Sequence, residues 1–78
     1  MERLGTVHRI AGTLLVLRAA STDPAPIGAT AIDENLDTVG RVVDVFGPKS
    51  APYLAVSPAD AVSPARLVQK PLYWRPNR

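Results

Sequence analysis

Eight prolines and five glycines are distributed along these 78 residues, and their spacing limits the fold more than any other feature. Proline removes a backbone donor and breaks a helix interior, and glycine weakens one. The chain is interrupted too often for long helices. Short β-strands fit between the interruptions, because strands in globular domains are commonly only about five residues long.

Six segments carry the apolar and β-branched residues typical of short strands. The segment densest in valine is Thr38 to Phe46, which ends at Gly47-Pro48, and Ala11-Gly12 predicts a hairpin turn between the first two segments. Residues 59–69 allow at most a helical turn on either side of Pro64. The predicted strands are residues 4–10, 13–19, 27–33, 38–46, 53–57 and 71–74.

Strands this short, with turn signals between them, predict a small all-β barrel or sandwich. Closure into a barrel would also remove unpaired strand edges. We expect a single domain over residues 1–74, followed by a short basic tail over residues 75–78. A domain of this length buries only about 60 to 65% of its unfolded surface, so docking on a partner is one way to bury more.

The composition argues against several classes of protein. There is no cysteine for a disulfide or a thiolate metal site, and the single histidine, His8, has no second ligand nearby in sequence, so we expect no metal and no cofactor. The net charge is +2, and no dense run of Lys or Arg marks a nucleic-acid stripe. The apolar stretch after Arg9 imitates a signal peptide, but Arg18 interrupts it. The stretch fits two β-strands better than a signal peptide, so we expect a soluble cytoplasmic protein.

No residue pattern indicates catalysis. A nucleophile and its base would both depend on His8, which lies within a predicted strand. Asp33 and Glu34 fall in a polar turn, where solvated carboxylates are more common than a general acid and base. Gly40 and Gly47 are isolated and precede no helix, so neither forms a phosphate loop. We expect a protein that is not an enzyme.

Asp44 breaks the alternation of its strand. Strict alternation places it on the face of Val42 and Phe46, where an unpaired buried carboxylate would be costly. It must therefore lie at a barrel rim, at a β-bulge, or on a face that meets a partner. The rings of Phe46 and Tyr53 are candidates both for the core and for an interface, and we expect Trp74 to cover one end of the barrel.

The connection between Phe46 and Tyr53 is longer than a two-residue hairpin turn, and it contains Pro48 and Pro52. Both prolines restrict the backbone, so part of the entropy that a binding loop loses is already lost before binding. A rigid loop that carries an aromatic anchor and little charge suits a protein–protein contact better than a phosphate contact.

The stretch "VGRVVDVFGP", followed shortly by "PYLAVSP", resembles the signature of a known family. This is the small H/ACA ribonucleoprotein core protein named for its glycine- and arginine-rich domains, the Gar-type subunit, in its compact archaeal form. The opening "RLGTVHRI" and the late "PLYW" resemble that family's first strand and its "LY" strand. The matching residues of the central signature are Gly40, Val42, Asp44, Phe46, Gly47, Pro48, Pro52, Tyr53 and Val56.

The resemblance implies a closed six-stranded β-barrel of the type also found in translation factors. It implies a non-catalytic subunit that binds the pseudouridine synthase subunit of the H/ACA particle in an archaeal-type cell. There it would aid substrate RNA loading and turnover in RNA-guided pseudouridylation of rRNA, meeting guide and substrate RNA mainly indirectly. The candidate partner-binding residues are Phe46, Gly47, Pro48, Pro52, Tyr53 and Val56. The glycine- and arginine-rich tails of eukaryotic members are absent, so the candidates for auxiliary RNA contact are Lys70, Arg75 and Arg78.

Two other functions stay open. The net positive charge and the basic tail are compatible with a stand-alone RNA-binding barrel of ribosome-maturation or translation-factor type, whose RNA affinity would fall steeply with salt. The apolar hairpin could also pair with a second copy of itself, as in a dimerisation module.

Overall fold

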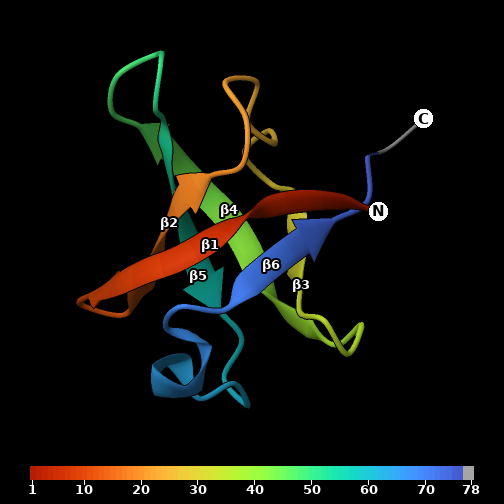
Figure 1. Cartoon of the computed structure of the whole chain (residues 1–78). Coiled ribbons are helices and arrows are strands. Elements are labelled where there is room, and N and C mark those ends of the chain that lie inside the picture. Colours follow the sequence, from red (N-terminus) through yellow and green to blue (C-terminus); the bar gives the residue numbers. More distant parts are fainter. Residues whose placement is uncertain (77–78) are drawn as a thin grey trace.

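The computed structural model describes residues 1–76, which form a closed antiparallel barrel of six strands (Figure 1). The order of the strands around the barrel is β1-β2-β5-β4-β3-β6. This confirms the predicted all-β, six-stranded closed barrel. The strands are β1 (Glu2–Ala11), β2 (Leu14–Ala19), β3 (Thr30–Ile32), β4 (Thr38–Phe46), β5 (Tyr53–Pro58) and β6 (Pro71–Trp74).

The third strand is shorter than predicted, because a turn replaces its first residues. Gly28 adopts a φ of 97°, and the N–H of Ala29 donates to the carbonyl of Pro26 at 3.1 Å. The ladder to β4 nevertheless continues past β3, since the N–H of Val42 donates to the carbonyl of Ala29 at 2.9 Å. Beyond Val42, β4 pairs with β5 alone. The end of β4 therefore has a strand neighbour on one side only.

A 3₁₀ turn, η1 (Pro64–Leu67), follows β5, which is consistent with the sequence allowing at most a helical turn on either side of Pro64. The segment after it is held to β1 by two backbone bonds, from the N–H of Gln69 to the carbonyl of Val7 and from the N–H of Val7 to the carbonyl of Lys70. The half-buried Leu67 packs against the core. This segment covers one end of the barrel (Figure 1). Within residues 1–76, no helical segment has the length and hydropathy that crossing a bilayer requires.

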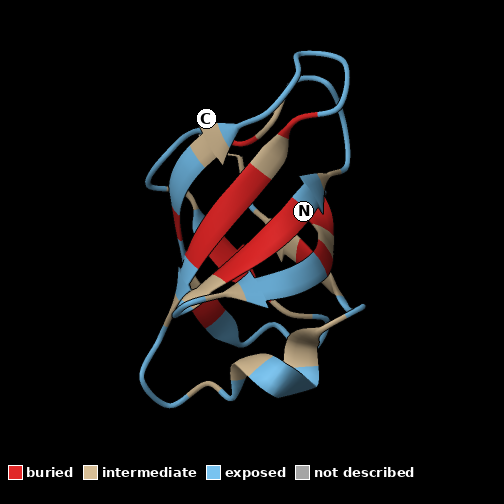
Figure 2. Cartoon of the chain, turned by 90° about the vertical axis from the view of Figure 1, so that its left-hand side faces the viewer, coloured by how far each residue is buried: buried red, intermediate tan, exposed pale blue. Residues whose placement is uncertain are grey.

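Aliphatic side chains fill the barrel interior, and buried residues follow the strands while the loops at both ends are largely exposed (Figure 2). Burial of each such side chain contributes about 1.5 to 3 kcal/mol. The largest fully buried side chains are Leu15, Leu17, Leu54, Leu72, Val7, Val39, Val42 and Val56. Phe46, Tyr53 and Tyr73 lie outside this cluster, whereas Trp74 is partly buried against it, in agreement with its predicted covering role.

Gly40 marks a close approach of β4 and β5. A Cβ at this position would collide with the carbonyl oxygen of Ser57, which belongs to the paired strand. Glycine inside a strand commonly marks such a contact between backbones. The first glycine of the "VGRVVDVFGP" stretch is thus required by the barrel itself, and not by a surface.

Candidate functional site

Phe46 and Tyr53 face outward as a stacked pair. They are paired residues of β4 and β5, and the next pair, Val45 and Leu54, has Leu54 fully buried, so alternation directs Tyr53 to the outside. Phe46 is 43% exposed and Tyr53 is half-buried. The ring centroids lie 5.7 Å apart with the planes 20° from parallel. The pair belongs to the outer surface and not to the core.

Gly47 allows this pair to form. Its φ is 90°, a conformation that side chains other than glycine rarely adopt. A Cβ at Gly47 would also lie 2.9 Å from Cδ2 of Tyr53, so the ring occupies space that any other residue would fill. The Phe-Gly-Pro and Pro-Tyr parts of the signature are therefore in direct contact.

The two prolines of the loop have different positions. Pro48 is exposed, and its carbonyl accepts a hydrogen bond from the N–H of Ala51 at 3.1 Å. Pro52 is buried, and its carbonyl accepts from the N–H of Ala19 at the end of β2, at 3.0 Å. The prediction that Pro52 contacts a partner needs correction, because this residue is buried.

Val56 is the second correction among the predicted partner contacts. Its side chain is 0% exposed, because it lies on the inward face of β5 with Leu54. It contributes to the core and has no access to an outer surface. Phe46, Gly47, Pro48 and Tyr53 remain as the predicted contact residues at the surface.

Strands β1 and β2 add residues to this outer face that the sequence had not indicated. Around the barrel, Thr6 pairs with Arg18 and Arg18 pairs with Tyr53, which continues the row that contains Phe46. In the adjacent row Arg9 pairs with Val16, which itself pairs with Ala55. We call these two rows the aromatic face; its residues are Thr6, Arg18, Tyr53, Phe46, Arg9, Val16, Ala55 and Asp44.

A shallow hollow lies within the aromatic face. It is lined by His8, Arg9, Val16, Phe46 and Tyr53. Val16 points outward but is only 6% exposed, so it forms an apolar floor beneath the rings. The imidazole of His8 lies 6.5 Å from the ring of Tyr53, between centroids. No local pattern in the sequence predicts that His8 and Arg9 of β1 lie near the β4–β5 hairpin. Only the order of the strands around the barrel brings them together.

Asp44 lies at a β-bulge, one of the three places predicted for it. The register shifts between Val42 and Asp44, which leaves Val43 as the extra residue opposite β5. The bulge rotates Asp44 to the exposed surface, where its Oδ1 accepts a hydrogen bond from the N–H of Val45 at 2.8 Å. The carboxylate is thereby solvated, so the free-energy cost of burying an unpaired charge is avoided.

The predicted auxiliary RNA contacts lie elsewhere. Lys70 lines a hollow at the end of the barrel that η1 covers, and Arg75 lines another with Trp74 and Ile27. Neither residue lines a hollow that borders Phe46 or Tyr53. Arg78 lies outside the residues that the structure describes.

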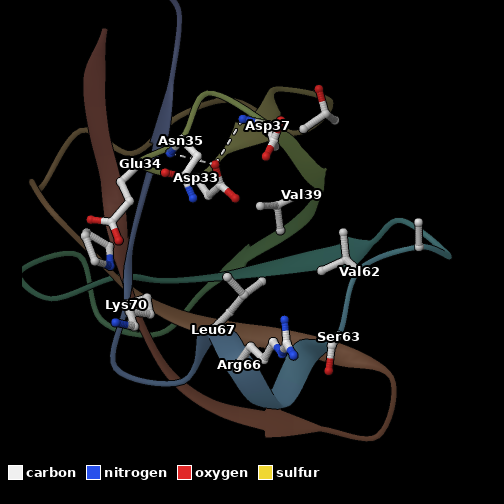
Figure 3. Close-up of a pocket in the computed structure, with 13 residues that line it drawn as sticks. Asp33, Glu34, Asn35, Asp37, Val39, Val62, Ser63, Arg66, Leu67 and Lys70 are labelled. Atoms are coloured by element: carbon white, nitrogen blue, oxygen red, sulfur yellow. Dashed lines mark hydrogen bonds between the residues drawn. The ribbon is translucent and has the colours of Figure 1, made fainter.

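The hollow beside η1 has a different chemistry (Figure 3). Its volume is about 510 Å³, and Asp33, Glu34 and Asp37 of the β3–β4 turn lie on one side of it, with Arg66 and Lys70 on the other. Asp33 uses its carboxylate within the turn, accepting from the N–H groups of Asn35 and Asp37. No three His, Cys, Asp or Glu side chains in residues 1–76 come together as a metal-binding group.

The chain was compared with known proteins. None of the protein-family models matches it. A protein of Methanothermobacter thermautotrophicus is 27% identical to it over 66 residues, which cover 85% of this chain and 71% of that protein. That relative is itself described only as an uncharacterized protein, so the chain is similar to a methanogen protein whose name carries no function to transfer.

Proposed function

We propose that this protein is a non-catalytic subunit of an H/ACA ribonucleoprotein, acting in the cytoplasm of an archaeal-type cell. Its partner is the pseudouridine synthase subunit, which docks on the aromatic face. Docking there aids substrate RNA loading and turnover in RNA-guided pseudouridylation of rRNA. Guide and substrate RNA are reached mainly through the synthase.

The outward-facing stack of Phe46 and Tyr53 is the observation that carries this proposal. Two rings that could have filled the core are instead held at the surface, on a loop shaped by Gly47 and tied to β2 through Pro52. Aromatic side chains presented by a rigid support are enriched among the residues that dominate binding energy in protein interfaces. The similarity to a methanogen protein agrees with an archaeal-type cell.

The proposal also explains why the signature residues occur together. Gly40 is needed for the approach of two strands and Gly47 for the seat of Tyr53, and the backbone carbonyl of Pro52 anchors the loop to β2. Each of these residues maintains the shape of the face, whereas Phe46 and Tyr53 supply its exposed rings. A subunit that acts only by binding its partner needs a surface of fixed shape. It needs no catalytic group of its own.

Binding of the purified synthase subunit tests the proposal, measured by titration calorimetry. We expect Phe46→Ala to weaken binding about thirtyfold, since loss of an aromatic anchor costs about 2 kcal/mol. Ile27→Ala is the matched control, because Ile27 is 64% exposed and lines a different hollow, with Trp74. It should bind as the unaltered protein does.

Circular dichroism must show that both variants remain folded. The proposal is wrong if the unaltered protein does not bind the synthase. The assignment of the face is wrong if Phe46→Ala and Ile27→Ala bind equally well.

A stand-alone RNA-binding barrel is the second candidate, because Arg9 and Arg18 lie beside the exposed rings. Exposed rings with nearby cations are also the means by which barrels bind single-stranded RNA. Titration of the isolated protein with an oligonucleotide at two salt concentrations tests this candidate. It predicts an affinity that falls steeply as salt rises, and no binding near physiological salt would remove it.

A further inference from the structure

The Phe46–Tyr53 stack is bordered by three hollows, and each of them contains one cationic side chain. Arg9 lines the first, Arg18 the second and Lys49 the third. No Asp or Glu is among the residues that line these three hollows. Three cations thus border the two outward-facing rings, although the whole chain has a net charge of only +2.

This local excess arises from where the acids lie. Three of the seven acidic residues belong to the β3–β4 turn, which lies at the opposite end of β4 (Figure 1). On the aromatic face, Asp44 is the one acid, and one of its oxygens already accepts from the N–H of Val45. The three cations beside the rings therefore outnumber the one acid of the aromatic face, and a positively charged docked surface would be repelled.

The aromatic face also has an apolar part, which can contact an apolar side chain of the partner. The floor of the hollow between His8 and Phe46 is Val16, which pairs with the 4% exposed Ala55. Val43, the bulge residue next to Asp44 on β4, is 42% exposed. An apolar side chain from the partner can contact this floor and the two rings, with polar groups remaining at the rim, as in most protein interfaces.

We infer that the synthase surface that docks on the aromatic face is acidic. It presents Asp or Glu side chains to Arg9, Arg18 and Lys49, around an apolar side chain that enters the hollow above Val16. Guanidinium groups form paired hydrogen bonds with carboxylates, which sets orientation as well as attraction. This inference rests on the proposed function and adds the chemistry of the partner to it.

A protein partner fits these observations better than RNA does. Non-specific binding of nucleic acid depends almost entirely on phosphate contacts, and a protein that makes about six to ten of them loses affinity steeply as salt rises. Here three cations border the rings, and Asp44 lies in the same pair of rows. The exposed apolar side chain of Phe46 would gain little from phosphates.

Association kinetics with the purified synthase subunit test the inference, by stopped flow at low and at high salt. The double variant Arg9→Glu/Arg18→Glu should associate at least about tenfold more slowly at low salt, with a smaller difference at high salt. The control is Arg66→Glu/Lys70→Glu, which changes the net charge by the same amount beside η1. It should change the association rate less than about twofold.

The neutral variant Arg9→Gln/Arg18→Gln serves as a second test in case Arg9→Glu/Arg18→Glu does not fold. It should associate at a rate between those of the unaltered protein and the double Glu variant. If the unaltered protein does not bind the synthase at all, the proposed function fails. If it binds but both double Glu variants associate equally fast, the acidic partner surface is wrong while the proposed function stands. If the isolated protein binds an oligouridylate at physiological salt and Arg9→Glu/Arg18→Glu abolishes this binding, the two arginines bind RNA phosphates. The inference of an acidic protein partner is then overturned.

Discussion

The two turns at the ends of β4 are built by different means. The β3–β4 turn, Asp33 to Asp37, is held by the carboxylate of Asp33, which accepts from two backbone N–H groups. The β4–β5 loop, Gly47 to Pro52, includes none of the side-chain hydrogen bonds found in residues 1–76. Its shape comes from a positive φ, two prolines and the ring of Tyr53.

This difference determines what each turn presents to solvent. A turn held by a carboxylate places charge at the surface, and three of the five residues from Asp33 to Asp37 are acidic. A loop held by steric contact and backbone hydrogen bonds has instead a ring facing outward at each of its ends, Phe46 and Tyr53. The same strand thus carries a solvated turn at one end and a candidate protein-binding surface at the other (Figure 1).

Gly47→Ala should have the largest effect on stability. It combines the cost of a left-handed backbone, about 1 to 2 kcal/mol, with overpacking against Tyr53, about 1 to 3 kcal/mol. We expect a loss of about 2 to 5 kcal/mol, measured by urea denaturation. Gly28→Ala is the matched control, because Gly28 has a φ of 97° and nothing within 4 Å of an added Cβ.

Gly28→Ala should lose only about 1 to 2 kcal/mol, the backbone part of the cost. Only Gly47→Ala should also weaken synthase binding, since it displaces Tyr53. Equal losses of stability in the two variants would show that the contact with the ring contributes nothing.

Asp33→Ala should have an intermediate effect, confined to the other turn. Loss of two exposed hydrogen bonds costs about 1 to 2 kcal/mol, which lowers the Tm of a domain this small by about 4 to 16 °C. Asp33→Asn keeps an acceptor oxygen and should restore most of the stability. A Tm for Asp33→Asn as low as that for Asp33→Ala would contradict the role of the acceptor, and synthase binding should be unchanged in both.

Leu36→Asn should have the smallest effect and the opposite sign. Leu36 has a φ of 69° and is 59% exposed, so it adopts a strained conformation and buries little. Asparagine tolerates this conformation better, and we expect a gain of about 1 kcal/mol or less. Ile27→Asn is the control, since Ile27 is exposed without a positive φ. A loss of stability in Leu36→Asn would show that the leucine side chain makes a compensating contact.

Much of the fold could be predicted because short-range sterics determine it. Valine-rich stretches and the Gly and Pro residues between them located all six strands, and the misfit of Asp44 in an alternating strand pointed to the bulge. The third strand was predicted too long, because the sequence does not reveal that Gly28 takes a positive φ. The site was predicted in part, with Phe46 and Tyr53 located but their burial undecided.

The sequence by itself determined the local elements: which segments form strands, which turns contain proline, and which residues cannot alternate simply. Only the tertiary structure decided that the rings lie outside, because Leu and Val side chains already fill the interior. It also decided that Arg9 and Arg18 lie beside those rings. That neighbourhood follows from the pairing of β2 with β5, a contact between segments far apart in the chain that no local pattern specifies.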